Sequence, residues 1–178
     1  MTGTGQAPSA RPPLPSARAG LTPRHTAGAE PVFAELSKGQ ELFTRTVDLD
    51  RGALIAYAAA SGDHNPIHWN DRFAREVGLD GVIAHGMLTM GVAGAAVSDW
   101  AGDPAAVVTF ETRFTRPVPV PDPGAATVTV VGTAGALTPD DAASGGGTGG
   151  QVRVDLKVTG PDGATVLAKS RATVRLER

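Results

Sequence analysis

Apolar and polar residues alternate with a helical period in the first half of the chain. Residues 51–62 read RGALIAYAAASG, and they lie between Asp50, which can cap a helix, and Gly62, which can end it. Residues 70–79, NDRFAREVGL, predict a second and shorter helix. The inward-facing stripe predicted for the first helix is Leu54, Ile55, Tyr57 and Ala58.

A third helical segment, AHGMLTMGVAGAAVSDW, is apolar nearly all round. Its three glycines, Gly86, Gly91 and Gly94, give it a poor intrinsic helix propensity. We therefore expect this helix to be buried, with a sheet wrapped closely against its small residues.

The period then changes from helical to alternating and stays so to the end of the chain. The segment AVVTFETRF predicts a strand in which one side carries Val108, Phe110, Thr112 and Phe114. The segment QVRVDLKV predicts another, in which one side carries Val152, Val154, Leu156 and Val158. Two further strands are predicted from Thr127 and from Thr165, and an earlier one in residues 31–48. The order strand, helices, then four strands predicts an α+β fold in which a curled antiparallel sheet holds a buried helix.

Composition divides the chain into an N-terminal extension and one domain. We expect residues 1–30, which are rich in Pro, Gly, Ala and Ser, to form a disordered extension, and residues 31–178 to form a single domain. The Gly-rich segment 138–150 is predicted to be a flexible loop, because glycines that are not followed by a helix do not cradle phosphate.

Charge and cysteine content exclude several classes of function. The net charge is -2 with no basic block, so a nucleic acid partner is not expected. With no cysteine, disulfides, thiolate metal sites and thiol nucleophiles are excluded. The longest apolar run is shorter than the roughly 18 residues that a membrane span needs, so we expect a cytoplasmic protein without membrane association.

The segment SGDHNPIHWND, residues 61–71, concentrates titratable groups. His64 and His68 are four apart, but Pro66 argues against the continuous helix that a zinc pair would need, and no metal is expected. A loop stiffened at the step from Asn65 to Pro66 can instead aim Asp63 and His68 at one small volume, where they would act as an acid and base pair. The alternative is that Asp63 caps a helix and His68 is a buried, hydrogen-bonded histidine.

The tetrapeptide AHGM begins the long helix. Unpaired amides and the helix dipole favour negative charge there, and Gly86 has no side chain to block a ligand. A thioester carbonyl at this position would be polarised, and its enolate would be stabilised. Alternatively, Gly86 is required for close packing of the helix, and both explanations can be true.

The segment YAAASGDHNPIHWNDRFAREVGLDGVIAHGM resembles the signature of the MaoC-like, or R-specific enoyl-thioester hydratase, family of hot-dog folds. The following segment is similar in more detail to the actinobacterial 3-hydroxyacyl-thioester dehydratase B subunits. The resemblance implies a hydro-lyase that reversibly dehydrates a (3R)-hydroxyacyl thioester to the trans-2-enoyl thioester in fatty-acid elongation, without cofactor or metal. It makes Asp63 and His68 the catalytic pair and assigns substrate binding to Gly86, Asn65 and His85. Tyr57 would pack behind the site.

The same resemblance implies an assembly. The substrate is carried on coenzyme A or on acyl carrier protein, and the open sheet edge of a hot-dog protomer favours a dimer, here a heterodimer with a non-catalytic hot-dog subunit. Some relatives have a hydroxyl side chain near the carbonyl, where this chain has Gly94. Two other functions remain open, a hot-dog acyl-thioesterase and a non-catalytic acyl-binding subunit.

Overall fold

The computed structural model of the chain describes residues 31–140 and 149–177. The extension predicted at residues 1–30 and most of the predicted flexible loop, residues 141–148, lie outside the described residues.

Within this part of the chain, five strands form one sheet in the order β1-β3-β4-β5-β2. Every neighbouring pair is antiparallel. The predicted α+β class is confirmed, and β1 and β2 are the two edges of the sheet. The strands are β1 (Glu41–Asp50), β2 (Val107–Phe114), β3 (Ala125–Pro139), β4 (Gly150–Thr159) and β5 (Thr165–Leu176).

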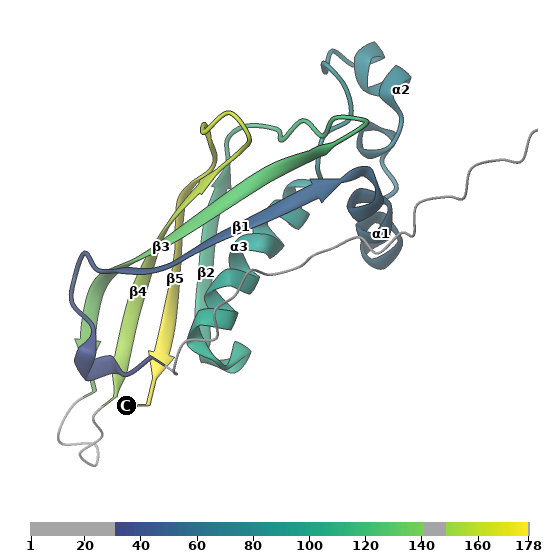
Figure 1. The fold of residues 1–178 in the computed structure, drawn as a ribbon. Helices are drawn as coiled ribbons and strands as arrows, with labels where there is room; N and C mark the ends of the chain where they lie inside the picture. The colour runs from purple at the N-terminus through teal and green to yellow at the C-terminus, as the bar shows by residue number, and fades with distance from the viewer. Residues whose placement is uncertain (1–30, 141–148, 178) are drawn as a thin grey trace, which may run out of the picture.

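The helices lie on one side of this sheet and at one of its ends. The long helix α3 runs along one face and contacts all five strands, while α1 and α2 lie near one end (Figure 1). No helix of the described residues has the length and hydropathy needed to cross a bilayer. The helices are α1 (Arg51–Ser61), α2 (Asp71–Glu76) and α3 (Gly86–Ala101), with the 3-10 turns η1 (Phe33–Glu35), η2 (Pro66–His68) and η3 (Pro104–Ala106).

Helix α1 begins and ends where the sequence predicts. The Asp50 side chain accepts a hydrogen bond from the Ala53 amide at 2.7 Å, and Gly62 ends the helix in the left-handed region with φ 77°. The predicted buried stripe is wrong at one position, because Ile55 is 54% exposed whereas Leu54 is fully buried. The helix has only one covered side, which is narrower than the stripe that the apolar pattern predicts.

Helix α3 is less enclosed than predicted. Seven of its residues are buried, but Met87, Gly91 and Ala95 are exposed and lie on one stripe of the helix. A Cβ added at Gly91 or Gly94 would have no other atom within 4 Å, so no sheet packs closely against these two glycines. Helix α3 therefore has a bare stripe beside the sheet.

The sheet face toward α3 is the hydrophobic core. Valines at alternate positions of β3 and β4 are completely buried there, which confirms the alternation predicted for β4. The alternation predicted for β2 is wrong at both ends, since Val108 is 54% and Phe114 50% exposed. Strand β2 is an edge whose pairing with β5 is interrupted by register shifts, so its apolar side chains are not all covered.

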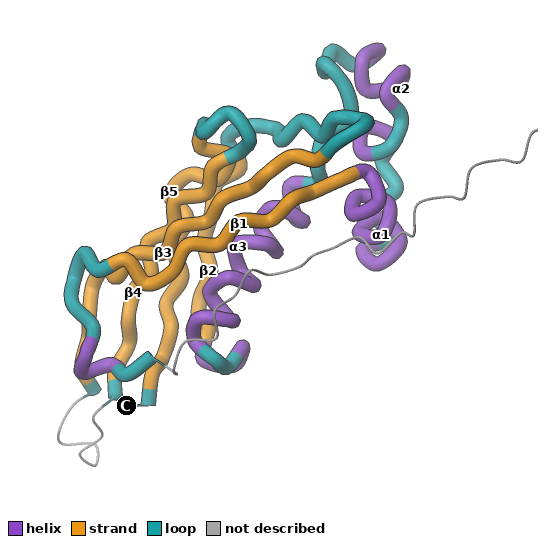
Figure 2. Tube along the Cα trace, in the orientation of Figure 1, coloured by secondary structure: helices purple, strands orange, loops and turns teal. Residues whose placement is uncertain are grey.

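Two connecting segments meet at the end of the sheet near α1 and α2 (Figure 2). The residues that precede α3 pair with the loop that follows β2: the Ala84 amide donates to the Val118 carbonyl at 2.8 Å, and the Val120 amide donates to the Val82 carbonyl at 2.9 Å. This pairing fixes the entry of the chain into α3, and the candidate site lies beside it.

Candidate active site

The loop that follows α1 is held by its own polar groups. The Asp63 amide donates to the Ser61 hydroxyl at 3.2 Å, and the Asp63 carboxylate accepts from the Asn65 amide at 3.2 Å. This local bond turns the chain and fixes one carboxylate oxygen. The other oxygen is free to face a ligand, and the side chain is 51% exposed.

The turn η2 places His68. Asn65 caps η2 by accepting from the Ile67 amide at 3.2 Å, and Pro66 occupies the first position. His68 is the last residue of η2 and is buried, with only 7% of its surface exposed. The local order Asn, Pro, x, His therefore forms a short rigid arm that carries an imidazole inward.

Hydrogen bonding assigns the tautomer of His68. Its Nδ1 lies 2.8 Å from the Ile83 carbonyl oxygen, which can only accept, so Nδ1 carries the proton. A neutral His68 then has a lone pair on Nε2, and this atom lies 3.9 Å from Oδ2 of Asp63. That separation is too long for a direct hydrogen bond, but both atoms can contact one water molecule.

His85 lies beneath this pair. Its ring stacks on His68 with 3.8 Å between centroids and contacts Tyr57 at 4.8 Å, the place expected for that tyrosine behind the site. Its Nε2 donates to the Asp63 carbonyl at 3.1 Å, while its Nδ1 has no hydrogen-bond partner within the described residues. Burial lowers the pKa of His85 and nearby His68 lowers it further, against the hydrogen bond to Asp63, which raises it. His85 is thus a neutral support for the Asp63 backbone.

Asp63, His68 and His85 also form a group whose potential metal ligand atoms lie within 4.8 Å of one another. An imidazole binds a metal in the plane of its ring. The two histidine rings are stacked with an interplanar angle of 24°, so their lone pairs do not converge on one point. The geometry fits a proton-transfer pair better than a metal centre.

Helix α3 contributes its N-terminus. Gly86 is its first residue, and the amides of the first turn have no partner within the helix. A Cβ at Gly86 would lie 3.3 Å from the Phe114 ring, and both residues line one cavity. Because Gly86 has no side chain, the N-terminus of α3, with the positive end of its helix dipole, is accessible from that cavity.

This cavity, which we call the acyl cavity, has a volume of about 390 Å³. His68 and Gly86 line it, and most of the other lining residues are apolar, among them Ile67, Ile83, Val118 and Leu167. Asp63, Asn65 and His85 are not lining residues. The structure thus brings His68 and Gly86 to one cavity, with Asp63 at the solvent side of His68 and with Asn65 and His85 in supporting positions.

A charged clamp holds the surrounding segments together. Arg51 of α1 forms two hydrogen bonds of 3.1 Å to the Asp71 carboxylate of α2 and donates to the Val120 carbonyl at 2.9 Å. Asp71 also accepts from the Val82 amide at 3.2 Å. The Arg51 hydrogen bond, followed by that of the Val82 amide, lowers the pKa of Asp71. Both helices and both paired segments are therefore connected through one ion pair.

Sequence reasoning did not single out Thr89, Phe114 and Arg116, which also line the acyl cavity. Thr89 is buried on α3, three residues after Gly86, and its hydroxyl donates to the His85 carbonyl at 3.4 Å. The sequence signal that could have identified Thr89 is its spacing of three residues from Gly86 on a predicted helix. Phe114 and Arg116 come from the end of β2, and their approach to α3 depends on strand order, which no local pattern encodes.

A family model described as MaoC like domain matches residues 33–143. The chain is 43% identical over 65 residues to "3-hydroxyacyl-thioester dehydratase X" of Mycobacterium tuberculosis, which covers 36% of this chain and 22% of that protein. It is 32% identical over 101 residues to "(R)-specific enoyl-CoA hydratase" of Rhodospirillum rubrum, covering 56% of this chain and 69% of the relative. The chain thus spans about a fifth of the first relative and about two thirds of the second.

Solved structures agree with the predicted fold. A protein titled "MaoC-like dehydratase" superposes with a TM-score of 0.70 at 35% identity, over 83% of this chain and 42% of that one. One chain of the ChsH1-ChsH2 complex from Mycobacterium tuberculosis has a TM-score of 0.59 at 21% identity, over 79% of this chain and 97% of that one, which shows a shared fold.

Proposed function

We propose, because this chain belongs to the MaoC like domain family, that it reversibly hydrates a trans-2-enoyl thioester to the (3R)-hydroxyacyl thioester. The observation that carries the proposal is the convergence of three groups. His68 and Gly86, the first residue of α3, line the acyl cavity, and the Asp63 carboxylate lies 3.9 Å from Nε2 of His68 on its solvent side.

In the hydration direction, a water molecule lies between Asp63 and Nε2 of His68. Nε2 of His68 accepts a proton from this water while Nδ1 keeps its own proton, hydrogen-bonded to the Ile83 carbonyl, and the water oxygen forms a bond to C3 of the enoyl group. The π electrons of the C2–C3 bond move into the thioester, and the resulting enolate oxygen is stabilised at the Gly86 amide. Asp63 accepts the second water proton in a hydrogen bond and stabilises the imidazolium.

The proton on His68 then returns to C2 of the enolate, which completes the addition. One base serves both steps, because the proton taken from water is the one delivered to carbon. In the dehydration direction the same groups act in reverse order. Asn65 holds the Asp63 carboxylate through its amide, and His85 holds the Asp63 carbonyl.

The wider assignment extends this chemistry to a pathway and an assembly. We place the protein in fatty-acid elongation as a catalytic subunit; the names of its relatives agree with the dehydratase and hydratase chemistry that this role needs. Helix α3, which carries the bare stripe of Met87, Gly91 and Ala95, is in contact with edge strand β2. A second hot-dog subunit, non-catalytic or identical, would cover both and extend the sheet.

The test is the hydration of a short and a long trans-2-enoyl-CoA by the wild type and by Asp63→Asn, each alone and with a candidate partner subunit. We expect Asp63→Asn to lose activity by about 100- to 10,000-fold, the usual contribution of a general acid or base. Asp162→Asn is a matched control, because Asp162 is an exposed aspartate that accepts from the amide two residues on, as Asp63 does.

Three results would contradict the proposal. Equal activity of Asp63→Asn and the wild type would favour a non-catalytic acyl-binding subunit. Release of free thiol at the rate of substrate loss would identify a thioesterase. Full turnover by a homodimer of the isolated chain would remove the heterodimer from the proposal but leave the chemistry in place.

A further inference from the structure

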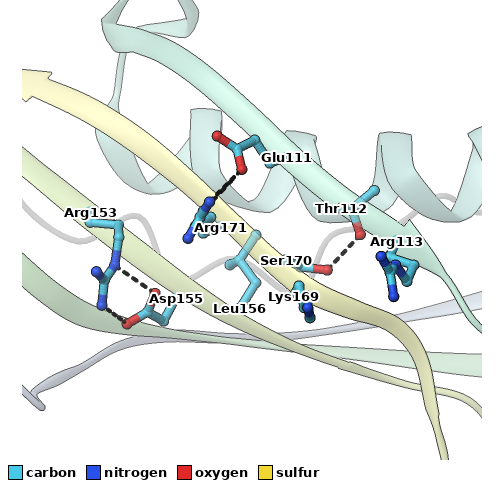
Figure 3. Close-up of a pocket in the computed structure, with 9 residues that line it drawn as sticks. All are labelled: Glu111, Thr112, Arg113, Arg153, Asp155, Leu156, Lys169, Ser170 and Arg171. Carbon is cyan, nitrogen blue, oxygen red and sulfur yellow. Dashed lines mark hydrogen bonds and ion pairs between the residues drawn. The ribbon is translucent and has the colours of Figure 1, made fainter.

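A hydrogen-bonded pair of hydroxyls lies on the core face of the sheet and has no part in the proposed chemistry. The Thr112 and Ser170 hydroxyl oxygens are 2.6 Å apart, and Figure 3 shows the two side chains pointing toward one another from β2 and β5. Ser170 is buried, and Ala172 and Val174, at the next alternate positions of β5, belong to the hydrophobic core. The pair therefore lies on the sheet face that α3 covers.

The acyl cavity ends one step before this hydroxyl pair. On β2, Phe114 lines the cavity, and Thr112 is the next residue on the same face of the strand. On β5, Leu167 lines the cavity and is paired with Phe114, whereas Ser170 does not line it. The hydroxyl pair thus forms the layer directly behind Phe114 and Leu167.

A bulge in β5 separates these two layers. Between two matched positions, one residue of β2, Thr112, lies opposite two residues of β5, Lys169 and Ser170. Lys169 has φ 52°, a left-handed conformation that is unfavourable for a residue with a side chain. Residues two apart on a regular strand share a face, yet Leu167 lines the acyl cavity and Lys169 does not. The bond between Thr112 and Ser170 therefore joins β2 to β5 where the bulge interrupts their regular pairing.

Helix α3 closes the same end of the acyl cavity. The residues of α3 that line it are Gly86 and Thr89, which are about 4.5 Å apart along the helix axis at 1.5 Å per residue. Ala93, one turn further on the same side of the helix, is completely buried in the core. The cavity thus extends inward by about one helical turn from the place proposed for the thioester oxygen.

The size of the acyl cavity indicates how many carbons it can hold. Its lining residues 114–117 are exposed and mark the opening, whereas Thr89 and Leu167 are buried and mark the inner end. The volume of about 390 Å³ equals that of about 13 water molecules at ~30 Å³ each. The thioester sulfur and oxygen and the catalytic water take part of it, which leaves room for an acyl group of about eight carbons.

We propose that Leu167, held in place by the hydrogen-bonded pair of Thr112 and Ser170, closes the inner end of the acyl cavity and limits the substrate to enoyl groups no longer than octenoyl. This inference rests on the proposed function, which places the thioester oxygen at Gly86. Each methylene that the cavity buries strengthens binding about fourfold. A carbon beyond the inner end must displace side chains that are already packed, which weakens binding by about 10- to 100-fold.

The proposed assembly leaves this limit in place. The inner end is formed within one chain by buried residues of α3 and β5. A second subunit over the bare stripe of α3 and the edge of β2 would cover exposed residues and would not lengthen the cavity at Leu167.

A series of enoyl-CoA substrates, from crotonyl through hexenoyl, octenoyl and decenoyl to dodecenoyl, tests the inference on the assembled protein. For the wild type, kcat/KM should increase up to octenoyl and fall by about 10- to 100-fold at dodecenoyl. Leu167→Val and Leu167→Ala shorten the side chain in two steps, so the optimum should move to decenoyl in Leu167→Ala. Leu167→Val makes the smaller cavity and keeps the test available if Leu167→Ala does not fold. A wild-type kcat/KM for dodecenoyl as high as that for octenoyl would overturn the inference.

Thr112→Val tests the hydroxyl pair with little change in side-chain volume. Without the bond to Ser170, β2 and Leu167 can move apart, so the ratio of kcat/KM for dodecenoyl to that for octenoyl should rise about tenfold. A general loss of stability would lower both values and leave their ratio unchanged. Thr112→Ser keeps the hydroxyl and should keep the wild-type ratio.

Thr127→Val is the matched control for Thr112→Val. The Thr127 hydroxyl also bonds to a neighbouring strand, donating to Asp48 at 2.7 Å, but this bond joins β3 to β1 and Thr127 does not line the acyl cavity. The control should keep the wild-type ratio. An equal change of ratio in Thr127→Val, or no change in Thr112→Val, would contradict the role of the hydroxyl pair.

Binding of saturated thioesters separates this inference from the proposed function, because butyryl-, octanoyl- and dodecanoyl-CoA cannot be hydrated. In calorimetry we expect octanoyl-CoA to bind most tightly to the wild type, and Leu167→Ala to bind dodecanoyl-CoA more tightly than the wild type does. If no enoyl thioester is hydrated but this chain-length limit is seen, the proposed function fails and the inference stands. If enoyl thioesters of every length are hydrated equally well, the function stands and the inference fails.

Discussion

Gly86→Ala separates the contribution of Gly86 to folding from its contribution to chemistry. The added Cβ would lie 3.3 Å from two ring carbons of Phe114, a close contact that a shift of a few tenths of an ångström relieves. Phe114 is 50% exposed and can make that shift. Replacing a helical glycine by alanine stabilises by about 0.4–1 kcal/mol where the backbone conformation allows it, so the unfolding free energy should change by no more than about 1 kcal/mol.

The effect of Gly86→Ala on catalysis should be much larger. The methyl group would project toward Phe114 inside the acyl cavity, where the thioester oxygen must approach the Gly86 amide. Loss of one oxyanion donor reduces kcat by about 100- to 1,000-fold, which corresponds to about 2.7–4 kcal/mol. Urea unfolding and steady-state hydration of an enoyl thioester would measure the two quantities on the same preparation. Activity within about threefold of the wild type, in a folded variant, would refute the assignment of the Gly86 amide to the enolate oxygen.

Three further predictions follow from other contacts. Because the pKa of His85 is lowered, the unfolded chain takes up a proton on this histidine first as the pH falls below the ordinary histidine pKa of 6.5, so the free energy of unfolding decreases there by at most about 1.4 kcal/mol per pH unit. Urea titrations of His85→Gln should show a flatter pH dependence, and an unchanged curve would contradict this. Asp71→Asn should lower the free energy of unfolding by about 1 kcal/mol at neutral pH, a modest loss because the Asp71 carboxylate is partly exposed. This loss should vanish in urea titrations at a pH low enough to protonate Asp71 in the wild type, and a loss that does not change with pH would argue against a charge effect. Gly91→Lys should leave the protomer folded but dissociate its assembly in light scattering, since nothing lies within 4 Å of the new Cβ; an intact assembly would place the interface elsewhere.

Local signals explain why much of the site could be predicted from the sequence. Asp50 caps α1, Gly62 ends it, and Asn65 with Pro66 starts η2, and each uses bonds within a few residues. The spacing from Asp63 to His68 is set by these same bonds, so the cluster and its loop follow from the sequence alone. The expected helix start at Gly86 predicted a site for the thioester oxygen there, where α3 does begin, and the resemblance to a family added Asn65 and His85.

Long-range packing explains the errors. The apolar pattern of α3 does not reveal which side the sheet covers, and Gly91 and Gly94 were wrongly expected to contact strands. Alternation in β2 predicted buried ends, but β2 is an edge strand, and edge position depends on strand order. The predicted stripe of α1 included Ile55 for the same reason, since periodicity gives a face but not its width.

The sequence by itself determined the α+β class, the chain order of helices and strands, and the residues of the Asp63 and His68 loop, because capping, turn and alternation preferences act over a few residues. Only the tertiary structure decided that His85 stacks under His68, that Phe114 faces Gly86, and that a bulge turns Lys169 away from the acyl cavity. These contacts join residues far apart in the chain, and they are set by strand order, register and packing of the whole domain.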